Sequence, residues 1–273
     1  MALTVNTNMA AISAANTLNS TQGSLSETLG RVSSGMRITK AADDAAGAAV
    51  AQNLSTQARS GRQAIRNAND GVSVIQTAEA ASKEVLSILD RMRELAVQSA
   101  SDTLADDERA YIKTETTALI SEMSRIAQSS EFNGISLSNG STASLTVQVG
   151  VDGSSDSQIG ITLGDVTASS LGVNSLTLST AANSRTAIGT IDTAIDSVNN
   201  IRATYGATQN RLDNAINSMS SYVESLSSAA SQIQDADYAH ETAEMTRLQV
   251  MQQAGVAALG QARGMNQSVL SLL

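Results

Sequence analysis

Apolar residues recur every three or four positions along most of this chain, the spacing of helices that pack side by side. At the C-terminal end the unbroken series consists of Leu248, Met251, Gly255, Ala258, Ala262, Met265, Val269 and Leu272. Near the N-terminus the series consists of Ala11, Ala15, Leu18, Gln22, Leu25, Leu29, Val32 and Met36. Residues 1–26 carry no charged side chain, and residues 248–273 carry only Arg263. We therefore expect two uncharged helices with seams that pack against other helices, including those of other chains.

The same spacing predicts helices over most of the remaining sequence. Including the two ends, the predicted helices cover about residues 7–36, 45–101, 106–129, 188–233 and 238–273. The seam over 188–233 keeps its three/four alternation throughout, and a helix of that length spans roughly 70 Å. Helices therefore dominate the predicted fold.

Between the third and fourth helices the period changes to two. Leu145, Val147 and Val149 alternate with polar residues or glycine, and Ile159 and Ile161 alternate in the same way. Residues 152–156 read as a turn between them, so the segment predicts a β-hairpin. Two weaker signals flank it. Leu176 with Leu178 favours a further strand, and Asn133-Gly134 favours a turn.

These elements predict a mainly α fold: an elongated antiparallel coiled-coil or helical-bundle rod with paired terminal helices and a small β-hairpin insert at its far end. We expect an inner domain of residues 1–43 with 234–273, and a rod domain of residues 44–233 with the insert at about 136–180. A lone helix pair buries too little apolar surface to offset its ordering entropy. The termini should therefore fold on assembly.

Composition and charge exclude several classes of protein. The 273 residues contain no Pro, no Cys, no Trp and one Phe, which argues against the aromatic core of a compact enzyme and against disulfides. The net charge of −9 argues against nucleic-acid binding. No apolar stretch is long enough to span a membrane, and no cleavable signal peptide is recognisable. We expect no membrane partner and no cofactor.

Few side chains suggest chemistry. His240 is the only histidine, and no nucleophile motif accompanies it, so we expect a solvated or interface residue rather than a catalytic one. The carboxylate pairs Asp43/Asp44 and Asp235/Asp237 lack the further ligands of a calcium site. We interpret them as helix N-terminal caps. The sequence thus predicts neither a catalytic nor a metal site.

A basic stripe also stands out, because Arg59, Arg62 and Arg66 lie three and four residues apart on one helix face. In an acidic chain such a stripe favours ion pairs within or between subunits over phosphate binding.

Several motifs resemble those of bacterial flagellin. They are Arg31–Ile38, Ala42–Gly47, Arg66–Ser73, Arg91–Gln98, Phe132–Gly134, Gln209–Leu212, Ile233–Tyr238, Gln252–Gly255 and Val269–Leu273. The resemblance covers about the first 140 and the last 85 residues and is that of a short flagellin with little outer domain.

The resemblance implies a structural, non-enzymatic subunit that self-assembles into the extracellular flagellar filament. The seam residues of the two end helices would then pack in the filament core. Asp43 and Asp44 would lie at the joint between the inner helices and the rod. Shifts between two subunit packings would set the filament's curvature. Alternatives are a hook–filament junction protein and a coiled-coil signalling protein.

The resemblance also implies partners. These are the export apparatus, an export chaperone that holds residues 232–273, and the filament cap and junction proteins. Arg91, Leu95 and Glu115 match the stretch that a vertebrate Toll-like receptor recognises in some flagellins, although Asp90 departs from the usual motif. The other interpretation of these three residues is packing between rods. The Ser- and Thr-rich residues 136–190 would be either a solvated insert or, as in some flagellins, O-glycosylated.

Overall fold

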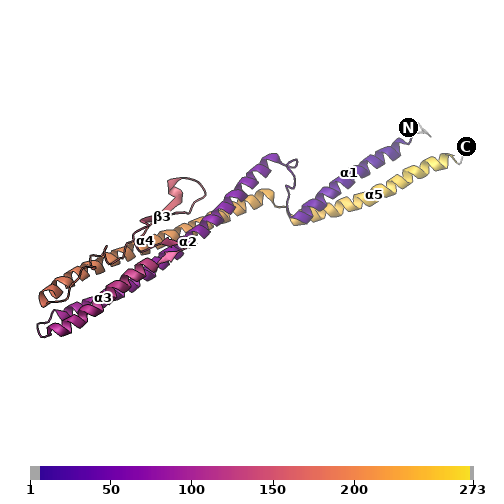
Figure 1. The fold of residues 1–273 in the computed structure, drawn as a ribbon. Coiled ribbons are helices and arrows are strands. Elements are labelled where there is room, and N and C mark those ends of the chain that lie inside the picture. The colour runs from indigo at the N-terminus through magenta and orange to yellow at the C-terminus, as the bar shows by residue number, and fades with distance from the viewer. Residues whose placement is uncertain (1–6, 271–273) are drawn as a thin grey trace. The chain divides into compact units, whose positions relative to one another are not determined.

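The computed structural model describes residues 7–270, with side chains to residue 264. Its helices are α1 (Met9–Ser34), α2 (Ala45–Ser99), α3 (Asp106–Ser129), α4 (Ala181–Gln234) and α5 (Tyr238–Leu270) (Figure 1). Short strands lie between α3 and α4: β1 (Glu131–Phe132), β2 (Ile135–Ser136), β3 (Ser144–Gln148) and β4 (Gln158–Thr162), with a 3₁₀ turn at Ser155–Ser157. The mainly α fold with a small hairpin is confirmed, and the predicted helix over 106–129 coincides with α3.

Contacts along the chain divide it into two units. The terminal unit comprises residues 1–57 and 225–273, and the central unit comprises residues 58–224. The domain boundaries predicted at 43/44 and 233/234 describe layers of an assembled filament. The contacts within one chain do not test them, so they stay a prediction.

In the terminal unit, α1 and α5 lie side by side in antiparallel directions (Figure 1). Asn8 begins α1 by accepting a hydrogen bond from the Ala11 N–H, and Gly35 ends it in the left-handed conformation at φ 71°. At Gly255 an added Cβ would lie 3.3 Å from the Leu18 side chain. The absence of a side chain there lets the two helices approach closely.

The central unit is a bundle of α2, α3 and α4 around one large apolar cluster. Val85, Leu89, Met92, Met123 and Ile191 are fully buried in it. The irregular segment 163–180 covers this cluster with further apolar side chains. Leu176 and Leu178 belong to that segment, so the further strand predicted there is wrong. The Leu178 carbonyl accepts a hydrogen bond from the buried Ser99 hydroxyl at 3.1 Å, which fixes the segment without strand pairing.

The predicted hairpin is confirmed, since β3 and β4 pair antiparallel with Leu145 opposite Ile161. Its position at the far end of the rod is wrong. The strands share an apolar cluster with Ile75 of α2 and Leu212 of α4. An added Cβ at Gly71 would lie 3.1 Å from Val147. This glycine lets the hairpin pack beside the middle of α2.

A smaller turn precedes the hairpin at the predicted Asn133-Gly134. Both residues are left-handed, with φ values of 50° and 77°, and they join the two-residue strands β1 and β2. The signal for a turn is thus confirmed.

The end of α2 is held by a buried arginine that sequence reasoning missed. The Arg109 side chain, 6% exposed, donates to the main-chain carbonyls of Ser99, Ser101 and Leu104, the last two at 2.8 and 3.1 Å. A cation at the C-terminal end of a helix complements its dipole. Arg109 therefore fixes the turn from α2 into α3.

Candidate assembly surface

The residues predicted to pack in the filament core fall into two sets. Facing the partner helix, Leu25 and Leu248 are buried, and Leu18, Val32, Gly255 and Ala262 are half-buried. The other set, Leu29, Met251 and Ala258, is exposed, and Met251 borders the groove between the two helices. The side chains of Met265 and Val269, and all of Leu272, lie outside the described residues. The predicted series therefore combines an internal seam with part of an outer face.

The internal seam of α1 also contains two residues that the apolar pattern missed. Thr21 and Thr28 are buried against α5. Their hydroxyls donate to the carbonyls of Thr17 and Ser24 one turn earlier, at 2.9 and 3.0 Å. Because each hydroxyl is satisfied within its own helix, threonine packs here like a small apolar residue.

Large apolar side chains are exposed along both helices of the pair in the part of the chain that the structure describes. They are Met9, Ile12, Leu29, Val250, Met251 and Val256. Val250 and Val256 are 60% and 57% exposed. Single exposed apolar residues are ordinary, but their repetition along two helices that carry no charge over residues 9–26 and 248–262 marks an interaction surface. We call these six residues the outer apolar face.

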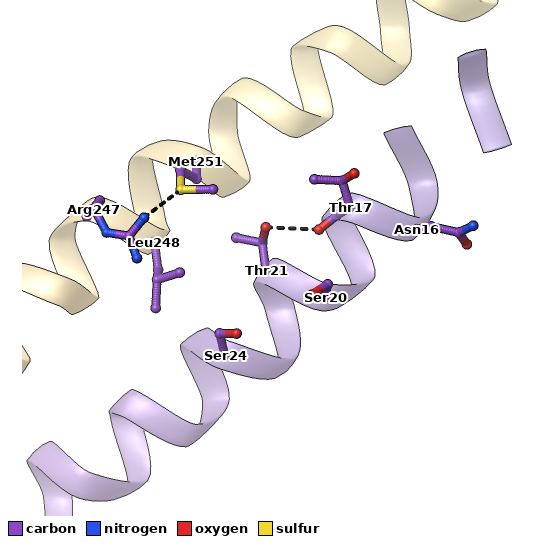
Figure 2. A pocket seen from close by; sticks show the side chains of 8 residues that line it. All are labelled: Asn16, Thr17, Ser20, Thr21, Ser24, Arg247, Leu248 and Met251. Atoms are coloured by element: carbon purple, nitrogen blue, oxygen red, sulfur yellow. Dashed lines mark hydrogen bonds between the residues drawn. The ribbon is translucent and has the colours of Figure 1, made fainter. Parts of the chain in front are cut away.

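A shallow groove of about 490 Å³ runs between α1 and α5 (Figure 2). Its α1 wall is hydroxyl- and amide-bearing, and its α5 wall contains Arg247, Leu248 and Met251. The Arg247 guanidinium donates to the Met251 sulfur at 3.2 Å and also pairs with Glu244 (Figure 2 shows the former). No nucleophile, base and orienting acid come together in this groove.

Where α1 ends and α5 begins, the main chain forms a contact that the sequence did not predict, distinct from the predicted joint at Asp43 and Asp44. Met36 and Asp235 form an isolated antiparallel bridge. The Arg37 N–H donates to the Gln234 carbonyl at 2.7 Å, and the Arg37 side chain donates to the Ile233 carbonyl at 2.7 Å. These bonds join the segment after α1 to the end of α4 and the segment that follows it.

An ion pair lies next to this main-chain contact. Arg31 of α1 lies 3.7 Å from Glu241 of α5, and the Glu241 side chain is 9% exposed. The pair links the two helices near the point where they meet.

The predicted capping role of the aspartates is confirmed for Asp44 and Asp237. Asp44 accepts from the Gly47 N–H at 2.8 Å at the start of α2, and Asp237 accepts from the Ala239 and His240 N–H groups at the start of α5. Asp43 accepts from the main-chain N–H groups of Lys40 and Thr39 and from the Thr39 hydroxyl, and these bonds lower its pKa. Among the described residues, no group of acidic, His or Cys side chains could hold a metal ion.

The candidate receptor residues are not equivalent in the structure. Arg91 pairs with Glu115 at 2.8 Å and with Glu94 at 3.0 Å on the exposed surface, and these bonds raise the pKa of Arg91. Leu95, on the same helix, is 2% exposed inside the bundle. The expectation that Leu95 offers a surface contact is therefore wrong, because its side of α2, unlike that of Arg91, faces the core.

The remaining sequence candidates lie at the surface. His240 is exposed, and its main-chain N–H donates to Asp237. In the basic stripe, the Arg66 side chain donates to the neutral amide oxygen of Gln63 rather than to a carboxylate. No helix of the described chain is long and apolar enough to cross a membrane.

Comparisons with known proteins agree with this geometry. Residues 5–143 match the bacterial flagellin N-terminal helical region, and residues 188–273 match the bacterial flagellin C-terminal helical region. The flagellar filament 33 kDa core protein of Treponema phagedenis is 38% identical over 98% of this chain and 99% of its own length. A flagellin of Halalkalibacterium halodurans is 39% identical over 89% of each chain.

Solved structures add the fold. The crystal structure of Bacillus cereus flagellin matches with a TM-score of 0.51 and 31% identity, covering 56% of this chain and 88% of that one. A hook-associated protein of Vibrio parahaemolyticus matches with a TM-score of 0.60 over 71% of this chain and all of its own, and its 15% identity shows the fold alone. Both terminal regions, the relatives and the described geometry agree: the chain belongs to the flagellin family.

Proposed function

We propose that this flagellin is the structural subunit of a flagellar filament and that its outer apolar face is covered by neighbouring copies. The observation that carries the proposal is the repetition of exposed apolar side chains along two helices that carry no charged side chain over residues 9–26 and 248–262. An interface of this kind buries apolar area without removing ions from water, which would be costly.

The energetic scale supports assembly through this face. Full burial of one large aliphatic side chain contributes about 1.5–3 kcal/mol. Several such side chains per subunit can offset the entropy lost when a subunit joins an assembly, which is about 4–15 kcal/mol. This burial free energy is gained again at each contact with a neighbouring subunit. The α1–α5 pair is therefore far more stable in a helical polymer than in a monomer.

In this proposal the layers follow the sequence prediction. Residues 1–43 and 234–273 form the core, and residues 44–233 form the rod around it. Asp43 and Asp44 hold the segment that connects the two. The surface pair Arg91–Glu115 is then available to neighbouring rods or to an innate receptor, whereas Leu95 supports the rod from inside.

The proposal also extends to the handling of the subunit before assembly. An uncharged apolar face exposed in the cytosol would associate early. A chaperone groove that covers residues 232–273 prevents this by the helix-in-groove mode, and the export apparatus, cap and junction proteins follow as partners. The subunit works by transmitting force rather than by catalysis, at an extracellular location.

Seeded elongation tests the proposal with a matched pair of variants. Val256→Asp places a charge on the outer apolar face, and Val97→Asp places the same charge on the central unit, where Val97 is 50% exposed. Filament fragments are mixed with each purified monomer, and pelleting is followed beside electron micrographs. We expect V97D to elongate and V256D to stay in solution. Elongation of V256D at the unsubstituted rate would refute the proposal.

A further inference from the structure

The turn between β1 and β2 places an asparagine side chain in an unusually free position next to a glycine. Asn133 and Gly134 are both exposed, and nothing lies within 4 Å of the position that a Gly134 Cβ would occupy. The Asn133 carboxamide forms no hydrogen bond within the described part of the chain. Its amide carbon therefore lies two bonds from the main chain with no partner to hold it away from the next peptide nitrogen.

This arrangement has a chemical consequence that needs no enzyme. The main-chain nitrogen of Gly134 can attack the Cγ atom of Asn133, forming a C–N bond while ammonia leaves. The product is a five-membered succinimide. Water then opens the ring at either carbonyl, giving an aspartyl or an isoaspartyl residue. The overall change is asparagine plus water to the acid plus ammonia, with no oxidant or reductant.

We propose that Asn133 is a site of spontaneous deamidation in the folded protein, and that the fold directs the reaction there. The chain supplies its own comparison, because Asn139 also precedes a glycine, Gly140. The two sites share the dipeptide and lie six residues apart by number. Any difference between their rates therefore reports the folded surroundings.

The surroundings of Asn139 restrain it in three ways. Its side-chain oxygen accepts from the Ser141 N–H at 3.0 Å and from the Ser141 hydroxyl at 2.6 Å. The residue is half-buried. The Asp165 carboxylate lies 2.6 Å from the position of a Gly140 Cβ, so the attacking nitrogen sits beside a negative charge. Rotation of the Asn139 amide toward that nitrogen has to break the Ser141 bonds.

The product would alter the turn itself. An isoaspartyl residue carries the main chain through its side-chain carbon and so lengthens a two-residue turn by one methylene. The turn also gains a negative charge beside the exposed Glu131. Phe132, which packs on the cluster beneath the hairpin, is the adjacent residue. The modified fraction should increase with the age of each molecule.

The test uses the intact chain in mildly alkaline buffer made with heavy-oxygen water. Trypsin releases both asparagines in one peptide between Arg125 and Arg185, so fragment ions compare the two sites without a difference in recovery. We expect native Asn133 to react roughly tenfold faster than native Asn139, a factor equivalent to about 1.4 kcal/mol. In denaturant the two rates should become equal.

Two variants sharpen the result. Ser141→Ala removes the hydroxyl bond, and should speed the reaction at Asn139 while leaving Asn133 unchanged. Asn133→Gln should abolish labelling at that position, because a longer side chain closes a less favourable ring. A native rate at Asn133 equal to or below that at Asn139 would overturn the proposal. So would a native rate at Asn133 far below its rate in denaturant, which would show that the turn protects it.

Discussion

Arg109 offers a sharp test of what holds the central unit together, because its guanidinium is buried and its closest partners are main-chain carbonyls. The substitution Arg109→Met keeps most of the side-chain volume and removes every donor. Ser99 is fully buried, so its carbonyl would lose its arginine partner with no water to replace it. Ser101 and Leu104 are half-buried, so water can reach their carbonyls.

The magnitude follows from these two situations. A buried acceptor left without a partner costs about 1–3 kcal/mol. Loss of a cation at the end of α2 costs about 0.3–1 kcal/mol more. We therefore expect R109M to lower the free energy of unfolding by about 1.3–4 kcal/mol. For a unit of this size each kcal/mol shifts the melting temperature by about 2–4 °C.

The assay is urea unfolding followed by tyrosine near-ultraviolet circular dichroism. Of the four tyrosines, Tyr205 is 1% exposed, whereas Tyr111, Tyr222 and Tyr238 are exposed, so the signal reports the central unit. The control is Arg125→Met, which removes a surface pair with Glu122 and should cost less than about 1 kcal/mol. If R109M and R125M unfold at the same urea concentration, the reasoning about main-chain carbonyls is refuted.

Further expectations concern single contacts of the central unit. Burial raises the pKa of Tyr205 even though its oxygen accepts from the Gly164 N–H, so one tyrosine should ionise only above the ordinary value of 10 in a spectrophotometric titration. Tyr205→Phe should remove that late phase, and its persistence would contradict the assignment. Arg93 lowers the pKa of Asp192 below 3.8, so this pair stabilises the fold above that value and the contribution is lost as the pH falls through the lowered pKa. On acidification from about pH 5, the Asp192→Asn variant should therefore lose less stability than the unsubstituted chain. An identical loss would show that the Arg93–Asp192 pair contributes nothing to the free energy of unfolding. Gly189→Ala meets nothing within 4 Å and should stabilise α4 by up to about 1 kcal/mol, whereas Gly61→Ala would place a Cβ 2.5 Å from Val223 and should destabilise by about 1–3 kcal/mol. Thermal melts that rank the two variants in the reverse order would contradict this geometry.

How far the sequence predicts this structure depends on the range of the interactions involved. Most helix bounds were predictable because the seams repeat every seven residues over long stretches and because Asp237 and Gly35 mark helix ends. The predicted start of the fourth helix at 188 is wrong, because α4 begins at Ala181, before its apolar seam. The hairpin was predictable because its alternation is local. Its location was not, since that depends on the close approach at Gly71, which only the folded unit brings beside Val147.

The sequence predicts that the end helices carry an assembly surface, but it does not predict which of their residues face outward. A count of apolar residues cannot tell the seam of a helix pair from the outer face when both recur at the same spacing. Thr21 and Thr28 fill the seam because their hydroxyls are satisfied internally, while the apolar Leu29 faces outward. The role of Arg109 could not be predicted from a sequence pattern, since its guanidinium donates to main-chain carbonyls, which every residue carries.

Helical reconstruction of the assembled filament by electron cryomicroscopy would show directly which surfaces join the subunits. We expect α1 and α5 to form the innermost layer and Ile12, Val250 and Val256 of the outer apolar face to contact neighbouring subunits. A filament in which those side chains face water, with every contact between subunits made by the central unit, would contradict this expectation.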